Sequence, residues 1–185
     1  MEILIPLAII LLLPMIYIIV QYNSLVSLRN HIRDSWANID TELRRRYDLI
    51  PNLVATVKGY AAHEKAVLER VIELRNRLVS QAGTALAHQA EEQELVNGLK
   101  HLLVIAENYP ALRADQHFLK LQQELINTED RIQAARRFYN GNVRDYRNKQ
   151  ESFPSNMVAG VFNFGPLEYF EVDSATRENV PAAKF

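Results

Sequence analysis

Apolar side chains recur every three or four positions over a long stretch of this chain, and this spacing is the strongest constraint on its fold. From residue 25 to residue 50 the steps are 3, 4, 4, 3, 4, 4 and 3, which keeps them on one helix face. The members are Leu25, Leu28, Ile32, Trp36, Ile39, Leu43, Tyr47 and Ile50. The same face continues through Val54, Val57, Ala61, Leu68, Val71 and Leu78. The pattern predicts a long amphipathic helix with one buried face.

Two further stretches have the same period. The first is marked by Leu95, Leu99, Leu102, Ala106 and Tyr109, and it ends at Pro110 because the residue before a proline avoids helix. The second begins near Asp115, a suitable N-cap, and is marked by Phe118, Leu121, Leu125, Thr128, Ile132, Ala135, Tyr139, Val143 and Tyr146. No strand pattern lies between the helices. The sequence therefore predicts an all-α antiparallel bundle of three to four long helices over residues 23–152.

Proline and glycine interrupt the helical pattern at three places. Pro51 has no N–H, and its ring crowds the carbonyl of Tyr47, so we expect a kink or short break between Asp48 and Pro51. Gly59 weakens the same helix by about 1 kcal/mol relative to alanine. The stretch Ser80–Ala87, with Gly83 inside it, predicts a turn.

The first residues predict a membrane anchor. Ile3–Val20 contains 18 residues without a charge, at the lower end of the length that spans a bilayer as a helix. A cleaved signal peptide is the alternative, but no lysine or arginine precedes the apolar run and no clear small-x-small cleavage site follows it. We therefore expect residues 1–22 to form a retained single transmembrane helix, in which Pro6 and Pro14 are tolerated.

Charges beside the anchor predict its orientation. Arg29, Arg33 and Arg44–Arg46 follow the apolar run, whereas only Glu2 and the terminal amine precede it. Because positively charged flanks stay on the cytoplasmic side, the soluble part is expected in the cytoplasm, at the inner face of the membrane.

Residues 153–185 form a C-terminal tail, in which the stretch "VFNFGPLEYFEV" lacks helical periodicity. Its aromatic side chains include Phe153, Phe162, Phe164, Tyr169 and Phe170. We expect this irregular tail to pack back onto the bundle, since exposed aromatic surface is costly. The alternative is that it forms a surface for a partner or for self-association.

Composition excludes several kinds of chemistry. The chain has no cysteine, which rules out disulfides, thiolate zinc sites and thiol nucleophiles. Its formal net charge of −1 gives no support for a nucleic-acid partner. His63-Glu64 begins a zincin signature, but Val67 stands where the second histidine is required. His88 and His101 are the remaining candidate metal pair, and no glycine-rich phosphate motif or G-x-S-x-G elbow is present.

Charged side chains on the predicted helices are interpreted mainly as surface. Glu91-Glu92 and Glu129-Asp130 fit solvated helix faces. Arg44, Arg45 and Arg46 span more than half a turn and cannot face one partner together. Arg45 should be the most exposed, and Arg46, at the edge of the buried face, should pair with Asp48 or with Glu129. The functional alternative is a docking patch for anionic lipid or protein. We expect no catalytic, cofactor-binding or metal-binding residues.

Long motifs in this chain resemble those of the LemA family. They are "YNSLVSLRN", "WANIDTELRRRYDLIPNLVATVKGYAAHE", "ENYPALRADQHFLKLQQELINTEDRIQAARRFYN", "FPSNMVAGVFNF" and the closing "RENVPAAKF". Asparagine is commoner in the family at the positions of Asp115 and His117. The resemblance implies a bacterial membrane-anchored protein with long antiparallel helices. It brings no catalytic residues with it, because no biochemical activity is established for the family.

These features together predict a non-enzymatic scaffold or adaptor. A single N-terminal span would hold a helical bundle at the membrane, where it binds itself as a homo-oligomer or binds other membrane proteins. The alternative is an accessory subunit of a membrane enzyme such as a quality-control protease. A cryptic enzyme is a third reading, which activity screening and metal analysis would decide.

Overall fold

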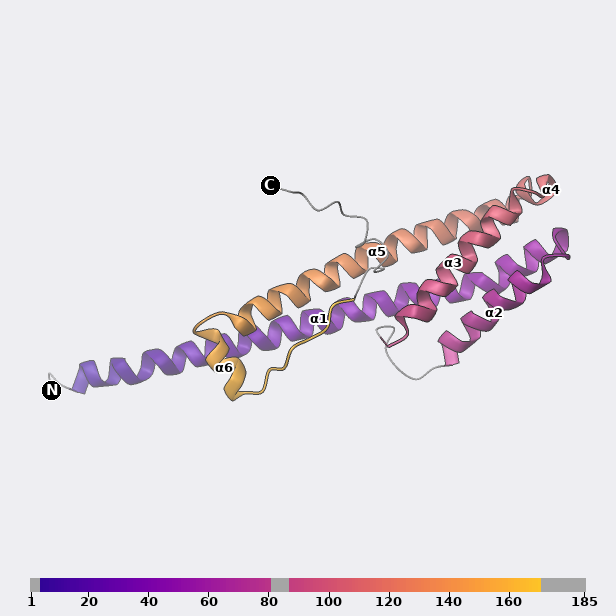
Figure 1. Ribbon diagram of the computed structural model, residues 1–185. Coiled ribbons are helices and arrows are strands. Elements are labelled where there is room, and N and C mark those ends of the chain that lie inside the picture. Colours follow the sequence, from indigo (N-terminus) through magenta and orange to yellow (C-terminus); the bar gives the residue numbers. More distant parts are fainter. Residues whose placement is uncertain (1–3, 81–86, 171–185) are drawn as a thin grey trace, which may run out of the picture. The chain divides into compact units, whose positions relative to one another are not determined.

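The computed structural model describes residues 4–80 and 87–170, and every regular element within these ranges is a helix (Figure 1). The helices are α1 (Leu4–Tyr60), α2 (Lys65–Ser80), α3 (Gln89–Ala106), α4 (Pro110–Arg113), α5 (Gln116–Glu151) and α6 (Ser155–Val161). The all-α class predicted from the sequence is thereby confirmed. The turn expected around Gly83 lies outside the described residues.

Helix α1 is 57 residues long and contains the apolar stripe. The stripe members from residue 25 to residue 57 are buried except Leu28 and Trp36, which are half-buried. By contrast, the first described side chains of α1 are exposed: Leu12, Leu13, Met15, Ile16, Ile18, Ile19 and Val20. By length and composition, α1 is apolar enough near its N-terminus to cross a membrane.

The chain divides into two compact units, and both contain parts of α1 and α5. The first unit consists of Met1–Ala37 and Ala135–Tyr169. The second consists of Asn38–Ala134, with Phe170 among the described residues.

In the second unit, α1 ends at Tyr60 and the helical stripe continues in a separate helix. The expectation of one long helix that continues to Leu78 is therefore wrong. The break comes after Tyr60, one residue beyond Gly59, and residues 61–64 form a turn in which the Glu64 N–H donates to the Ala61 carbonyl at 3.1 Å. Ala61 stays fully buried inside this turn. The apolar side chains of the stripe thus remain buried across the turn between α1 and α2.

Helices α2 and α3 pack closely in this unit. Their buried side chains include Leu68, Val71 and Leu74 on α2, and Leu95, Leu99 and Leu102 on α3. A Cβ atom built on Gly98 would lie 3.1 Å from a methyl group of Val71. Glycine at position 98 therefore allows the two helices to approach, because any larger residue would push against Val71.

Pro51 does not interrupt α1, which contradicts the expected short break. The missing N–H leaves the Tyr47 carbonyl without its usual partner in the helix. Arg75 from α2 supplies one, because its Nε–H donates to that carbonyl at 3.1 Å, while its Nη2 lies 3.9 Å from Asp48. A hydrogen bond from another helix thus satisfies the carbonyl that the proline frees.

Arg75→Ala is therefore expected to destabilise the wild-type chain by about 1–3 kcal/mol, since the Tyr47 carbonyl loses its donor. In a Pro51→Ala background the alanine N–H restores the intrahelical bond, so the same substitution should cost less. The measurement is a double-mutant cycle of urea unfolding on the full chain in detergent. Equal costs in the two backgrounds would refute the link between Arg75 and Pro51.

The start of α5 agrees with the sequence prediction. The Asp115 carboxylate accepts hydrogen bonds from the N–H groups of His117 and Phe118 at 2.8 and 2.9 Å, which is the geometry of an N-cap. These bonds stabilise the charged form and hold the pKa of Asp115 below its ordinary value. Tyr60 at the end of α1 adds a third donor to the same carboxylate at 2.8 Å.

In the first unit, the C-terminal half of α5 lies beside α1. The Trp36 and Tyr139 rings meet edge to face at 5.6 Å, and Lys149 donates to the Ser24 hydroxyl at 2.5 Å. After α6 the backbone turns at Asn163, whose φ of 54° is in the left-handed region that asparagine tolerates.

The segment after α6 then returns along α5. Three side chains of α5 donate to its carbonyls: Gln150 to Phe164, Tyr146 to Gly165 and Tyr139 to Glu168, at 2.7, 2.9 and 3.0 Å. The aromatic tail residues have different surroundings. Phe164 and Phe170 are buried, Phe162 and Tyr169 are partly exposed, and Phe153 is exposed.

A buried arginine–glutamate cluster as the candidate functional site

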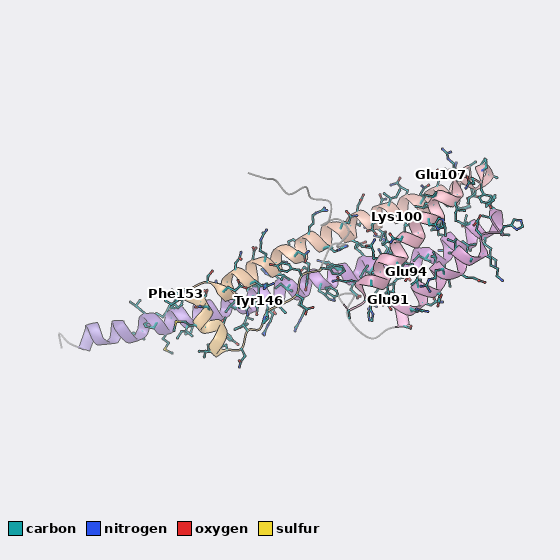
Figure 2. The ribbon with its side chains drawn as sticks, viewed as in Figure 1. Glu91, Glu94, Lys100, Glu107, Tyr146 and Phe153 are labelled. Atoms are coloured by element: carbon teal, nitrogen blue, oxygen red, sulfur yellow. The ribbon has the colours of Figure 1, made fainter. Side chains whose placement is uncertain are left out.

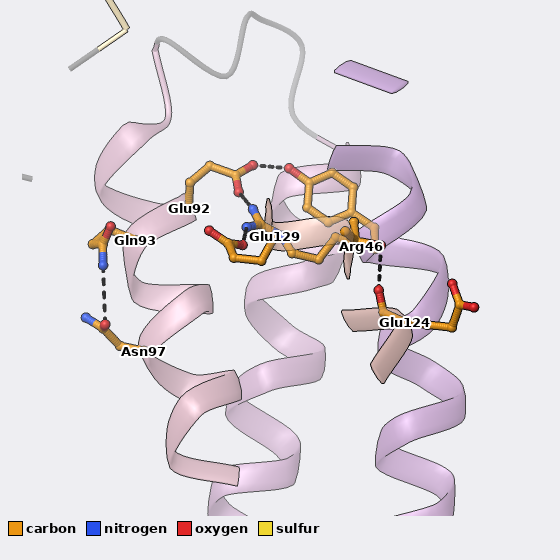
Figure 3. Close-up of polar contacts among 8 residues, drawn as sticks. Arg46, Glu92, Gln93, Asn97, Glu124 and Glu129 are labelled. Atoms are coloured by element: carbon orange, nitrogen blue, oxygen red, sulfur yellow. Dashed lines mark hydrogen bonds and ion pairs between the residues drawn. The ribbon is translucent and has the colours of Figure 1, made fainter. Parts of the chain in front are cut away.

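The most unusual group of side chains in the second unit is a set of charges inside the protein. Arg46 of α1 has only 3 % of its side chain exposed, and it lies between Glu92 of α3 and Glu129 of α5 (Figure 3). Its Nη1 donates to Glu129 at 3.1 Å, and its Nη2 donates to Glu92. The Tyr47 hydroxyl donates to the other oxygen of Glu92. One arginine thus joins three helices.

Helix periodicity accounts for the position of each member. Arg46 and Tyr47 occupy the buried side of α1 between Leu43 and Ile50. Glu92 is three residues before Leu95, so it belongs to the buried face of α3 that continues with Leu99. The expectation that Glu92 is solvated is therefore wrong. The spacing was visible in the sequence, but the neighbouring Glu91 made the pair look like surface charge.

The electrostatics of the cluster follow from its burial. Removal from water raises the pKa of Glu92, and the nearby charge of Glu129 adds to this, whereas Arg46 and Tyr47 oppose it. Burial likewise raises the pKa of Tyr47 above its ordinary value, so the phenol keeps its proton and donates a hydrogen bond to Glu92. Removing one partner from such a pair leaves an uncompensated buried charge.

The raised pKa of Glu92 predicts a pH dependence. The folded chain holds this proton to higher pH than the unfolded chain, so the contribution of Glu92 to stability falls as pH rises from its ordinary pKa of 4.5 through the raised folded value. Relative to Glu92→Gln, the wild type should therefore lose stability as the pH rises above the ordinary pKa of Glu92, by about 1.4 kcal/mol for each unit of pKa difference between the folded and unfolded chains.

Urea unfolding of the full chain and of Glu92→Gln at a series of pH values measures this difference. Glu107→Gln, at an exposed carboxylate just after α3, is the control for loss of one surface charge. A difference between wild type and Glu92→Gln that stays constant, or changes in favour of the wild type as pH rises, would contradict the prediction.

The other two arginines of the run lie on the surface. Arg44 pairs with Asp40 at 2.9 Å and has 75 % of its side chain exposed, whereas Arg45 has 49 % exposed and lies 4.0 Å from Glu42. Arg44, and not Arg45, is therefore the most exposed of the three. The expected pairing of Arg46 with Glu129 is confirmed. Asp48, the other expected partner, lies beside Arg75 instead.

His88 and His101, the candidate metal-binding pair, do not lie close together. His88 precedes α3 and His101 lies within it, so 13 positions, or about 20 Å along a helix, separate them. His88 lies 2.9 Å from Glu91, and His63 is exposed in the turn after α1. Among the residues that the structure describes, no three histidine, aspartate or glutamate side chains are grouped as metal ligands.

The geometry of the cluster suits a structural role better than catalysis. Both oxygens of Glu92 and the Tyr47 hydroxyl are engaged with each other or with Arg46. Arg46 has only 3 % of its side chain exposed, so its guanidinium is enclosed by protein. The arrangement fixes the alignment of α1, α3 and α5, because a shift of one helix along its axis would leave a buried charge without its partner.

Comparison with known proteins agrees with the motifs. The LemA family model matches residues 35–185. Magnetosome protein MamQ 2 of Paramagnetospirillum magneticum is 22% identical over 179 residues, which cover 83% of this chain and 66% of that protein. Magnetosome protein MamQ of Magnetospirillum gryphiswaldense is 21% identical, over 83% of this chain and 65% of that protein. Protein LemA of Metamycoplasma hominis is 24% identical, over 85% and 75%.

This chain therefore spans about two thirds of the length of the MamQ proteins that it matches. The family match covers residues 35–185 of the 185, which is most of the sequence. The chain belongs to the LemA family.

Proposed function

We propose that this protein is a non-enzymatic scaffold or adaptor anchored in the bacterial cytoplasmic membrane. The first turns of α1 span the bilayer, and the helices that follow form an antiparallel bundle on the cytoplasmic side. This bundle binds further copies of the chain and other membrane proteins. The observation that carries the proposal is the contrast along α1, whose early apolar side chains are exposed while its later apolar face is buried.

The exposed part of α1 supports the membrane span. From Leu12 to Val20 every described side chain except the half-buried Tyr17 is exposed, and almost all are aliphatic. Such a surface is unfavourable in water and favourable in hydrocarbon. Uncharged aliphatic residues in this number suit the interior of a bilayer.

Exposed apolar side chains of the second unit support self-association. Leu119 and Ile126 lie seven positions apart on α5, and hence on one face, with 42% and 44% of their surface exposed. Val104 on α3 is 59% exposed. Two copies of the chain would each present this apolar surface, and contact between the two surfaces would remove both from water.

In-cell photo-crosslinking tests the adaptor role. A photoreactive amino acid at Leu119 or Ile126 should give products that contain a second copy of the chain or another membrane protein. The same probe at Lys58, an exposed polar position of α1, should not. Products with a membrane enzyme alone would favour the accessory-subunit alternative. Absence of intermolecular products at all three positions would refute the adaptor role.

Arginines after the span predict the topology. Arg29 and Arg33 favour a cytoplasmic location for everything that follows the anchor. A fluorescent-protein fusion at the C-terminus should therefore be bright, and an alkaline phosphatase fusion at the same position inactive. An active phosphatase with a dark fluorescent protein would reverse the proposed orientation.

A further inference from the structure

Four apolar side chains of the first unit are exposed together around α6, and we name them the apolar corner. They are Phe153, Met157, Val161 and Phe162, with 80%, 63%, 75% and 47% of their surface exposed. Figure 2 shows Phe153 beyond the end of α5, past Tyr146. Such side chains in water are costly, which indicates that something else covers them.

Helix α6 carries apolar side chains both on its buried inner side and on its exposed outer side. Val158 and Ala159 are buried, and Met157 and Val161 on the outer side are exposed. The seven residues of this helix include no charged side chain. A helix that is apolar on its outer side as well as its inner side belongs in contact with protein or lipid rather than with water.

The apolar corner lies next to the place where α1 ends its exposed aliphatic run. The Phe162 ring is 4.8 Å from the Tyr22 ring, and Lys149 at the end of α5 donates to Ser24. Val20 is the last of the exposed aliphatic side chains in this part of α1. Tyr22 follows two positions later, about 3 Å further along the helix. The corner is therefore at the same level as the exit of the proposed span.

The first unit has an excess of positive charge, which is complementary to anionic lipid headgroups. Its described residues include seven lysines and arginines and four aspartates and glutamates. Two of these arginines lie over tail aromatics: Arg29 over Phe164 at 5.3 Å and Arg147 over Tyr169 at 5.4 Å. Basic and aromatic side chains gathered beside an apolar surface are typical of the membrane interface.

We propose that the apolar corner inserts into the lipid–water interface of the leaflet from which α1 emerges. This inference rests on the membrane span of the proposed function. Continuity with that span selects lipid as the occupant, because a corner at the level of the span exit meets headgroups before it meets another protein. The contact gives the first unit two attachments to one bilayer, the span and the corner, and so fixes its tilt.

The absence of cysteine makes a direct test simple. Single cysteines at Phe153, Met157 and Val161 carry an environment-sensitive fluorophore, in the full chain reconstituted in nanodiscs that contain anionic lipid. Lipids with a nitroxide on the acyl chain quench fluorophores that enter the bilayer. Ile18→Cys is the positive control inside the span. Phe138→Cys is the negative control, since it is 61% exposed on α5 and 15 positions, or about 22 Å, before Phe153.

The expected result is strong quenching at all three corner positions, several-fold above that at Phe138→Cys, with a shift to bluer emission. No quenching at Ile18→Cys would refute the membrane span and the inference with it. Quenching at Ile18→Cys without quenching at the corner would overturn the inference alone. Corner fluorescence that depends on the number of protein copies per disc, and not on the nitroxide, would assign the corner to a second copy and would also overturn it.

Discussion

Arg46→Met should lower the free energy of unfolding by about 3–5 kcal/mol. The substitution leaves the buried Glu92 without its cation, and the nearby Glu129 adds like charge. Replacing both partners, in Arg46→Met with Glu92→Leu, should cost clearly less than the single change, because it leaves no unpaired charge on Glu92. Urea unfolding of the full chain in detergent, followed by circular dichroism, measures both.

Arg44→Met is the matched control for this experiment. It removes an arginine two positions away on the same helix, but from an exposed pair with Asp40, so it should change stability by less than about 1 kcal/mol. Equal effects of Arg46→Met and Arg44→Met would contradict the view that the cluster holds the helices together. So would a double variant that is less stable than Arg46→Met.

Two charges in the exposed aliphatic part of α1 should remove the protein from the membrane. Leu12→Arg with Leu13→Arg places both charges near the middle of the apolar run, where each arginine costs about 2.5–3.5 kcal/mol. The doubly substituted chain should leave the carbonate-washed membrane fraction and appear in the soluble or aggregated fraction. The wild type should stay with the membrane.

Two arginines elsewhere control for the added charge. Val79→Arg with Val104→Arg adds the same charge at side chains that are 52% and 59% exposed in the second unit. This variant should remain in the membrane fraction. If the Leu12 and Leu13 variant also remained there, α1 would not be the anchor.

Helix class and burial were predictable because they depend on periodicity. The stripe from Leu25 to Val57 is buried or half-buried throughout, and Asp115 caps α5 as its side chain predicted. These features are local: helix geometry fixes which positions share a face, and a short carboxylate suits an N-cap.

The ends of α1 were less predictable because they depend on other helices. Pro51 is the stronger helix breaker in isolation, yet α1 passes through it and ends near the weaker Gly59. The reason is Arg75, which reaches the freed Tyr47 carbonyl from 28 positions further along the chain. Sequence periodicity does not reveal such a long-range donor.

The arginine cluster was predicted in part. The ion pair between Arg46 and Glu129 was predicted because Arg46 lies at the edge of the buried face of α1. Glu92 was missed because a charged residue was assigned to solvent although it continued the Leu95 and Leu99 face. Burial of a charge becomes plausible only when its partner is known, and the partner here is 46 positions away.

The mass of this 185-residue chain in detergent tests the proposed scaffold most directly. Light scattering over a wide range of protein concentration, corrected for bound detergent, gives the number of chains per particle. A self-associating scaffold predicts a mass of two or more 21.3 kDa chains that persists on dilution. A particle that contains one chain at every concentration would contradict self-association.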